Sequence, residues 1–205
     1  MSDTVETIYT DDKQRRVRIE YDMDGSSCDP REYDELVQVV TPDHNMTEHT
    51  DDATFEAQHD ALYERGLGGA FGRYLKIFHN IDAYPVFKFE HGNVALSVRD
   101  FGDRWDSGMI GWAYINPDAE TWEDMKPQEI ISSFLSELAK WMNGEVYGYI
   151  VERRVTGKKV YDDDVAEPED FEEWVEEEDG SCWGHIGFDW AVQAAKTALG
   201  IEEEN

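Results

Sequence analysis

Hydrophobic and polar residues alternate along several short stretches of the chain, and this period of two is typical of β-strands. The stretch 16–21 alternates in this way. Two further alternating stretches, 85–90 and 94–98, flank the turn residues at 91–93, and this arrangement predicts a β-hairpin. The strands expected are one near 16–21, an antiparallel meander around 84–115, and strands near 146–155 and 181–186.

Apolar residues recur every three to four positions in other stretches, which predicts helices. The most regular stretch is 127–143, where Pro127 suits the first turn and Gly144 suits the position just past the end. The stretch 32–40 fits a helix or a strand. We therefore predict an α+β fold with a single domain over 1–205 and a frayed tail at 201–205. In this fold the antiparallel sheet is packed by helices near 54–78, 127–143 and 188–199.

The most unusual feature of the composition is its net negative charge. The chain has 47 Asp and Glu but only 18 Lys and Arg, a formal net charge of −29 over 205 residues. The densest block is the acidic segment 162–179, which holds twelve acids and no base. Within it Phe171, Trp174 and Val175 recur at helical spacing, so we expect a short amphipathic helix with an acidic face.

This charge excludes some classes of function. Phosphate backbones and anionic membranes are held by Lys and Arg. Here these residues are few, and they gather only in the short runs 15–18, 153–154 and 158–159. We therefore expect no direct binding of nucleic acid or membrane. The first residues resemble no signal peptide, and two cysteines, Cys28 and Cys182, fit a reducing compartment. The expected location is the cytoplasm, within a host cell.

Several residues could carry chemistry. His91, Asp106 and Ser107 supply the three residue types of a hydrolase triad, and Cys182 could act as a nucleophile. The letters around Asp106 and Ser107 also fit a turn that leads into a strand, and a small buried thiol is the common fate of a cysteine. The remaining candidates match no established signature: the metal-type residues His44 and His49, and the Gly-rich run 66–69. No cofactor or metal site is assigned.

Four stretches together resemble a family of small uncharacterised proteins encoded mainly in phage and plasmid genomes. They read DPREYDEL, FKFEHGNVALSVRDFGDRWDSGMIGWAYI, GEVYGYIVE and SCWGHIG, within roughly residues 20 to 190. The resemblance implies a single-domain α+β protein from a mobile element and supplies no mechanism. The chain departs from the family's pattern at 33–35, where the family has Trp-Asp-Asn, at 41–44, the region of a family Cys and His, and at 91–93, where the family has His-Ser-Gly.

Two causes of the acidity are open. Residues 103–205 hold 26 acids and 8 bases, and the rest of the chain is also acidic, a spread that is typical of adaptation to molar salt. A protein that imitates DNA would instead carry an ordered row of carboxylates about 7 Å apart, like the phosphates of a strand. The acidic segment and the mobile-element resemblance fit this second cause.

The function expected from these observations is that of a non-enzymatic viral or mobile-element accessory protein. It would bind a host protein with a basic surface, and could inhibit a defence or nucleic-acid-binding enzyme as a DNA mimic. The alternatives are a salt-adapted halophilic protein of unknown role, and a small metal-binding or hydrolytic enzyme. The contacts expected to bind the partner are the carboxylates Asp162, Asp163, Asp164, Glu172, Glu173, Glu176 and Glu177.

Overall fold

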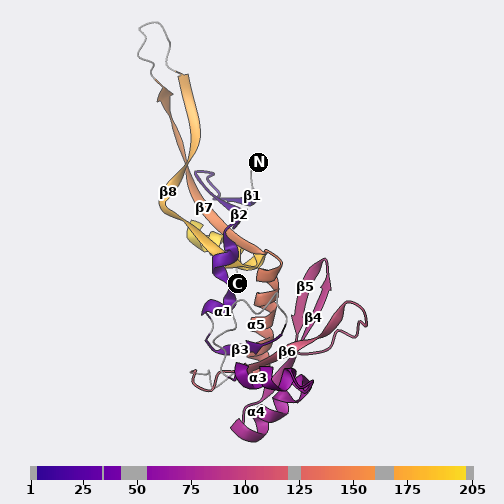
Figure 1. Cartoon of the computed structure of the whole chain (residues 1–205). Coiled ribbons are helices and arrows are strands. Elements are labelled where there is room, and N and C mark those ends of the chain that lie inside the picture. Colours follow the sequence, from indigo (N-terminus) through magenta and orange to yellow (C-terminus); the bar gives the residue numbers. More distant parts are fainter. Residues whose placement is uncertain (1–3, 34, 43–54, 120–125, 160–168, 202–205) are drawn as a thin grey trace. The chain divides into compact units, whose positions relative to one another are not determined.

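The computed structural model describes residues 4–33, 35–42, 55–119, 126–159 and 169–201 (Figure 1). The chain divides into two compact units. Unit 1 combines both ends of the chain, Met1–Ser27 and Glu145–Asn205, and unit 2 is the continuous segment Cys28–Gly144. Each unit has its own four-stranded antiparallel sheet. The α+β class is therefore confirmed, but strands that were expected in one sheet form two.

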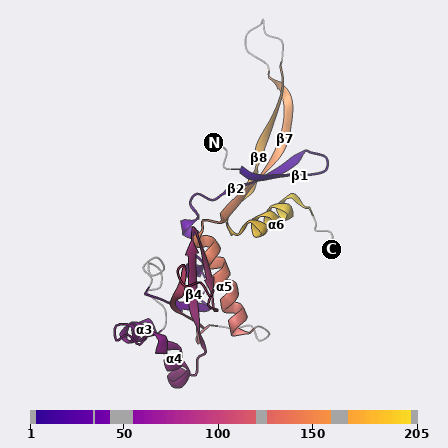
Figure 2. The same ribbon diagram turned by 90° about the vertical axis from the view of Figure 1, so that its right-hand side faces the viewer.

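Unit 1 is a sheet with the strand order β1-β2-β7-β8 and a helix, α6, on one face (Figure 2). The buried side chains of β2 and β7, among them Val17, Ile19 and Val151, pack against the small residues Ala191 and Ala195 of α6. The small side chains let the helix approach the sheet closely. The elements are β1 (Thr4–Tyr9), β2 (Arg15–Tyr21), the 3-10 helix η1 (Gly25–Cys28), β7 (Val146–Lys159), β8 (Glu169–Ile186) and α6 (Phe188–Leu199).

The hairpin of β7 and β8 is longer than the rest of the sheet. β2 pairs with β7 only as far as Arg15 opposite Arg153. Beyond that point 155–159 of β7 and 169–173 of β8 pair only with each other, and they form a two-stranded arm (Figure 1). A two-stranded ribbon without a third layer has little apolar burial of its own. The arm therefore depends on contacts between its two strands.

Unit 2 is a sheet with the strand order β3-β6-β4-β5, covered on one face by the long helix α5. Phe134 and Leu135 of α5 pack on Val39, Val86 and Ala113 of the sheet to form the larger core of the molecule. The elements are α1 (Pro30–Tyr33), β3 (Val37–Val40), α3 (Glu56–Tyr63), the 3-10 helix η2 (Gly68–Ala70), α4 (Phe71–His79), β4 (Ala83–His91), β5 (Asn93–Ser97), β6 (Ser107–Ile115) and α5 (Pro127–Met142).

A second core in unit 2 contains a buried polar atom. Phe71 and Leu75 of α4 pack on Val40 and Tyr114, which lie in neighbouring strands of the sheet. Burial raises the pKa of Tyr114, and its hydroxyl has no hydrogen-bond partner within the described residues. A buried hydroxyl without a partner opposes folding, because it loses water and gains nothing in exchange.

Replacing Tyr114 by phenylalanine should therefore not destabilise unit 2. Tyr114→Phe keeps the ring and removes only the unpartnered oxygen, so we expect the free energy of unfolding to stay unchanged or to rise by up to about 1 kcal/mol. Urea denaturation measures the change. A loss of more than about 1 kcal/mol, the usual value of a satisfied hydrogen bond, would contradict the prediction.

Most expected helices are confirmed, and two local expectations change. The helices near 54–78, 127–143 and 188–199 appear as α3 with α4, α5 and α6. The ambiguous stretch 32–40 contains the end of α1 and all of β3. The tail prediction is wrong at Ile201, whose amide donates to the Lys196 carbonyl (3.0 Å) and whose side chain packs on the unit 1 core. The rest of the tail lies outside the described residues.

Candidate functional site

The predicted contact residues lie on a strand and not on a helix. Every described residue of the acidic segment from Glu169 onward belongs to β8, so the helix expected there is wrong. Helical spacing would bring all four predicted glutamates of this stretch to one side. In a strand successive side chains point to opposite faces, so Glu172 and Glu176 share one face and Glu173 lies on the other. Asp162, Asp163 and Asp164 lie outside the described residues, in the stretch that joins β7 to β8.

Two of the four described contact residues are held by arginines of the same unit. Arg154 of β7 donates to Glu172 (2.5 Å). Arg15 of β2 donates from two nitrogens to the two carboxylate oxygens of Glu177 (both 2.8 Å). These hydrogen bonds hold the pKa of both glutamates below the ordinary value of 4.5. Glu172 and Glu177 therefore stabilise the sheet, and the negative charge of each is balanced by its own arginine.

Unit 1 should consequently lose stability in acid partly through Glu177. A carboxylate with a depressed pKa contributes stability above its ordinary pKa, and this contribution disappears as the pH falls through the folded-state value. We expect the wild type to lose more stability than Glu177→Gln when the pH falls from about 5 to about 3. Urea denaturation at several pH values measures the difference. Equal pH dependence in the two proteins would show that Arg15 leaves the Glu177 titration unchanged.

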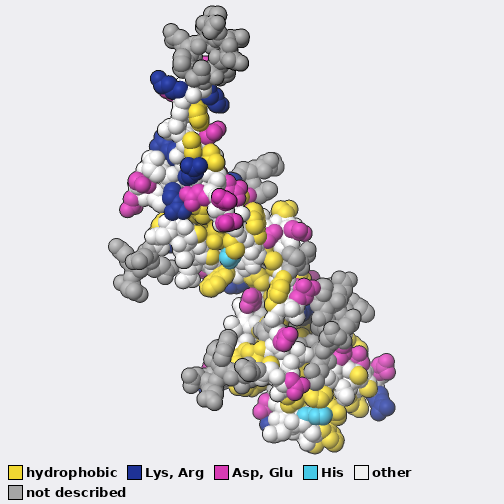
Figure 3. Space-filling model, turned by 90° about the vertical axis from the view of Figure 1, so that its left-hand side faces the viewer, with side chains coloured by type: hydrophobic (Ala, Val, Ile, Leu, Met, Phe, Trp, Pro, Cys, Tyr) yellow, Lys and Arg dark blue, Asp and Glu magenta, His cyan; other side chains and the backbone are white. Residues whose placement is uncertain are grey.

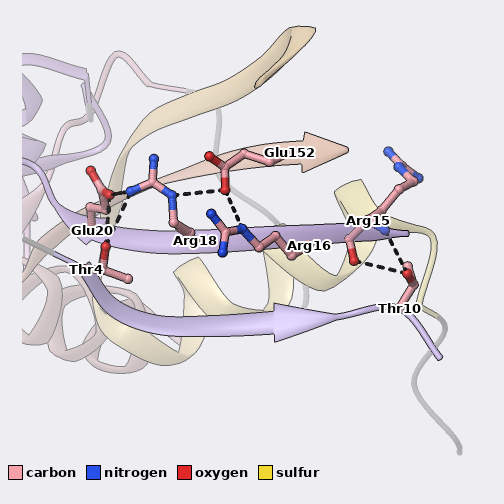
Figure 4. Close-up of polar contacts among 7 residues, drawn as sticks. All are labelled: Thr4, Thr10, Arg15, Arg16, Arg18, Glu20 and Glu152. Atoms are coloured by element: carbon pink, nitrogen blue, oxygen red, sulfur yellow. Dashed lines mark hydrogen bonds and ion pairs between the residues drawn. The ribbon is translucent and has the colours of Figure 1, made fainter. Parts of the chain in front are cut away.

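A second row of ion pairs runs across the face of the unit 1 sheet that α6 does not cover (Figure 4). Arg16 and Arg18 both donate to one oxygen of Glu152, at 2.6 and 3.1 Å. Arg18 also pairs with Glu20. Glu152 is buried, with only 7% of its surface exposed. The two arginines thus surround a carboxylate that would otherwise carry an uncompensated charge.

Aromatic side chains extend this row toward β8. The Arg16 guanidinium lies over the ring of Trp174, 4.4 Å from its centroid, and Tyr9 meets the same ring edge-on at 5.9 Å. At the far end of the strands Trp183 lies over Gly148, where a Cβ would come within 2.1 Å of the indole. Trp174 was expected to anchor an amphipathic helix, and it instead stacks on an arginine of the sheet.

Three glutamates of β8 have open carboxylates, meaning that no ion pair within the described residues involves them: Glu173, Glu176 and Glu178. All three are exposed. β8 is also an edge strand of its sheet. Charge on an edge strand discourages pairing with a second copy of the chain, so these residues have a structural use even without a partner. In the space-filling view basic and acidic side chains lie side by side along the hairpin (Figure 3).

The arginines are the part of this site that the sequence did not predict. In the sequence, the runs 15–18 and 153–154 are short, scattered and too few to predict nucleic-acid binding. They lie in neighbouring strands, in the register Arg15 opposite Arg153, next to the most acidic strand of the chain. The sequence contained one indication of this arrangement. Two of the short basic runs fall in stretches that were predicted to be strands, so their arginines could be expected on the surface of a sheet.

The candidates for catalysis are only partly brought together. His91 Nδ1 and Asp106 Oδ2 are 2.9 Å apart at the end of the hairpin in unit 2, where 75% of the His91 side chain is exposed. Ser107 donates its hydroxyl to the backbone carbonyl of Asp103 (2.7 Å). Asp103 also accepts the amides of Trp105 and Asp106, and these hydrogen bonds lower its pKa. These contacts are those of a turn, as the alternative interpretation expected.

Cys182 belongs to the other unit. It is exposed on β8, opposite Tyr149 of β7. Nearby His185 stacks on Tyr149, with ring centroids 5.4 Å apart, and burial lowers the pKa of His185. Within the described residues, no three side chains of His, Cys, Asp or Glu gather as a metal ion requires. His44 and His49 lie outside that part of the chain.

No family model, curated protein or solved structure matches this chain. The resemblance to phage and plasmid proteins therefore stays a prediction. In the described part of the chain no helix is both long and apolar enough to span a membrane. The function must be argued from the geometry of the two units.

Proposed function

We propose that the protein is a non-enzymatic binding protein that recognises a basic surface on a partner protein through β8. The observation that carries this proposal is the set of open carboxylates, Glu173, Glu176 and Glu178, on an exposed edge strand. Three other acids of β8 already form ion pairs with arginines or a lysine of the same unit: Asp170, Glu172 and Glu177. The open carboxylates are the ones available to a partner's Lys and Arg.

The arm favours the same interpretation. A hairpin that extends beyond its sheet exposes both faces of its strands, and it lacks the apolar burial that would stabilise it alone. Aromatic and basic side chains along it, such as Phe171 beneath Lys159 (5.5 Å), provide the mixed surface that protein interfaces use. As the resemblance to mobile-element proteins implies, the partner proposed is a host protein.

Imitation of DNA is the more specific form of this proposal. Alternate residues of a strand lie about 6.6 to 6.8 Å apart, close to the spacing of phosphates along a nucleic-acid strand. Asp170 and Glu172 form one such step on a single face, but Lys158 and Arg154 of the same unit already pair with them. Trp174 then interrupts the row before Glu176. Within the described residues the row on this face is therefore short. A longer row would need the aspartates at 162–164.

The test compares partner capture by the wild type and by two variants that have the same net charge as each other. The wild type is used beside a triple variant that neutralises the open carboxylates and a control variant that neutralises three exposed acids outside β8. The proteins are immobilised, exposed to host-cell lysate, and the captured proteins are identified by mass spectrometry. The triple variant is Glu173→Gln/Glu176→Gln/Glu178→Gln, and the control is Glu6→Gln/Glu35→Gln/Glu137→Gln.

We expect a basic partner that the wild type and the control retain and the β8 variant loses. With the purified partner, affinity should fall steeply as KCl rises, because charge pairs at an exposed surface are screened. Displacement of the partner's own nucleic acid would support the mimic form. Capture that is equal in all three proteins, or that ignores salt, would show that the open carboxylates do not form the binding surface.

A further inference from the structure

A cavity of about 730 Å³ lies within unit 2, between the β6 strand and the segment that joins α3 to α4. Its volume is in the range of small-molecule sites. Gly66 and Gly69 line it, and a Cβ at either position would meet nothing within 4 Å. The space next to these two residues is therefore empty because they have no side chains. The lining residues that carry the proposal below are His59, Tyr63, Glu64, Gly69, Met109 and Trp112.

The aromatic walls of the cavity are held in place by their neighbours. Trp112 donates its indole N–H to the carbonyl of Gly68 (3.0 Å), and its ring packs so closely on Gly72 that a Cβ there would come within 2.4 Å. The buried imidazole of His59 stacks on Tyr63 at 6.2 Å with an interplanar angle of 19°, and its Nδ1 lies 3.3 Å from Asp60. Fixed rings of this kind provide a prepared stacking surface.

The charge of the cavity favours a cation. Its described lining contains the carboxylate Glu64 and no Lys or Arg. The whole of unit 2 is acidic, with 22 Asp and Glu against 9 Lys and Arg in 28–144, so its field concentrates cations near its surface. Aromatic faces attract cations as well, and the attraction grows where water is excluded. An anionic ligand would find no Lys or Arg among these residues.

We propose that this cavity binds a small organic cation with a guanidinium group on an aliphatic stem. A guanidinium is planar and weakly hydrated, so it can stack on Trp112 or Tyr63 while it donates hydrogen bonds to Glu64. The aliphatic stem would contact Met109, whose side chain is 42% exposed in the structure. This site lies in unit 2 and is separate from the partner surface proposed on β8, which lies in unit 1.

The experiment uses two probes that differ in charge and hardly in shape. Arginine amide carries the guanidinium, and citrulline amide carries a neutral urea in its place. Binding to the full chain is measured by isothermal titration calorimetry, and the indole N–H signals in NMR spectra report whether Trp112 responds. Gly69→Leu fills the cavity at a position with open space and no positive φ, and Gly69→Ala is its matched control.

Arginine amide should bind, and citrulline amide should bind about tenfold more weakly or not at all. Gly69→Leu and Glu64→Gln should each weaken binding of arginine amide. Gly69→Ala, and Glu137→Gln on the exposed side of α5, should leave it unchanged. Equal binding of the two probes, no detectable binding of arginine amide, or binding unaffected by Gly69→Leu would each overturn the proposal. Loss of partner capture by the β8 variant is an independent result and leaves this one untouched.

Discussion

Replacing Gly111 by alanine is expected to lower the free energy of unfolding of unit 2 by about 3 kcal/mol, at the upper end of the cost of overpacking. A Cβ at Gly111 would lie 2.2 Å from the carbonyl oxygen of Val40 and 3.0 Å from the Cα of Thr41. Both are backbone atoms of the neighbouring chain segment, and Val40 is fixed by its pairing with Trp112. A flexible side chain could move aside, but this backbone cannot move without breaking the edge of the sheet.

The matched control for this prediction is Gly108 in the same strand, β6. A Cβ at Gly108 would meet nothing within 4 Å, so Gly108→Ala should leave the stability close to that of the wild type. Hydrogen exchange measured by mass spectrometry reports the pairing of β3 with Trp112–Ile115 of β6 directly. If the backbone amides of both variants exchange at the same rate as those of the wild type, the close contact between residue 111 and Val40 does not affect stability.

Replacing Glu152 by alanine is expected to destabilise unit 1 by about 2 kcal/mol. Removing one partner of a buried ion pair costs about 3–5 kcal/mol, and the part-exposed arginines here should recover some of this through water. Glu152 is the shared acceptor of Arg16 and Arg18, so its loss leaves two guanidinium groups beside each other without a common carboxylate. Their repulsion would act on β2, the strand that joins the two halves of the sheet.

A double-mutant cycle separates this coupling from lost packing. Glu152→Ala, Arg16→Ala and the double variant are compared by urea denaturation, and we expect an interaction free energy of about 1 kcal/mol or more. Glu173→Ala serves as the control, because Glu173 is exposed and forms no ion pair within the described residues. This change should lower the free energy of unfolding by less than about 0.5 kcal/mol. Additive effects of Glu152→Ala and Arg16→Ala would mean that the row of ion pairs does not act as a unit.

The elements with a strong local pattern were predictable from sequence. The hairpin of β4 and β5 and the helix α5 appear close to their expected bounds, because each has a regular period together with its own turn or end signal. The division into two sheets was not predictable in this way. It depends on which strands pair, and β2 pairs with β7, more than a hundred residues later. Local periodicity contains no information about such a pairing.

The acidic segment shows how a local pattern can mislead. Phe171, Trp174 and Val175 are spaced as on a helix, yet in β8 Trp174 lies on one face and the other two lie on the opposite face. The two aromatic residues have different contacts there: Trp174 stacks on Arg16, and Phe171 covers Gly157. The bases of β7 and β2 supply partners for the acids only when the segment is extended beside them. The tertiary contacts therefore override the helical spacing.

The candidate sites were predictable to different degrees. Of the four glutamates of β8 that were expected to contact a partner, Glu172, Glu173 and Glu176 are exposed. The fourth, Glu177, is half-buried and paired with Arg15, and contact with a partner stays a prediction for all four. The cavity in unit 2 was not expected. The Gly-rich run 66–69 matches no established signature in the sequence. Its role as a cavity wall depends on Trp112, which is distant in sequence.

The insertion of unit 2 within unit 1 has a consequence for folding during synthesis. β2 leaves the ribosome long before its partner β7, while all of Cys28–Gly144 is made in between. Chains grow at about 5–20 residues per second, so β2 waits about 6 to 25 seconds for β7 while unit 2 is made. During that time β2 can pair with β1 along one edge, but its other edge has no partner, and the strand carries Arg15, Arg16 and Arg18. Its arginines, repelled by one another and attracted to water, would keep the waiting strand from joining a wrong partner.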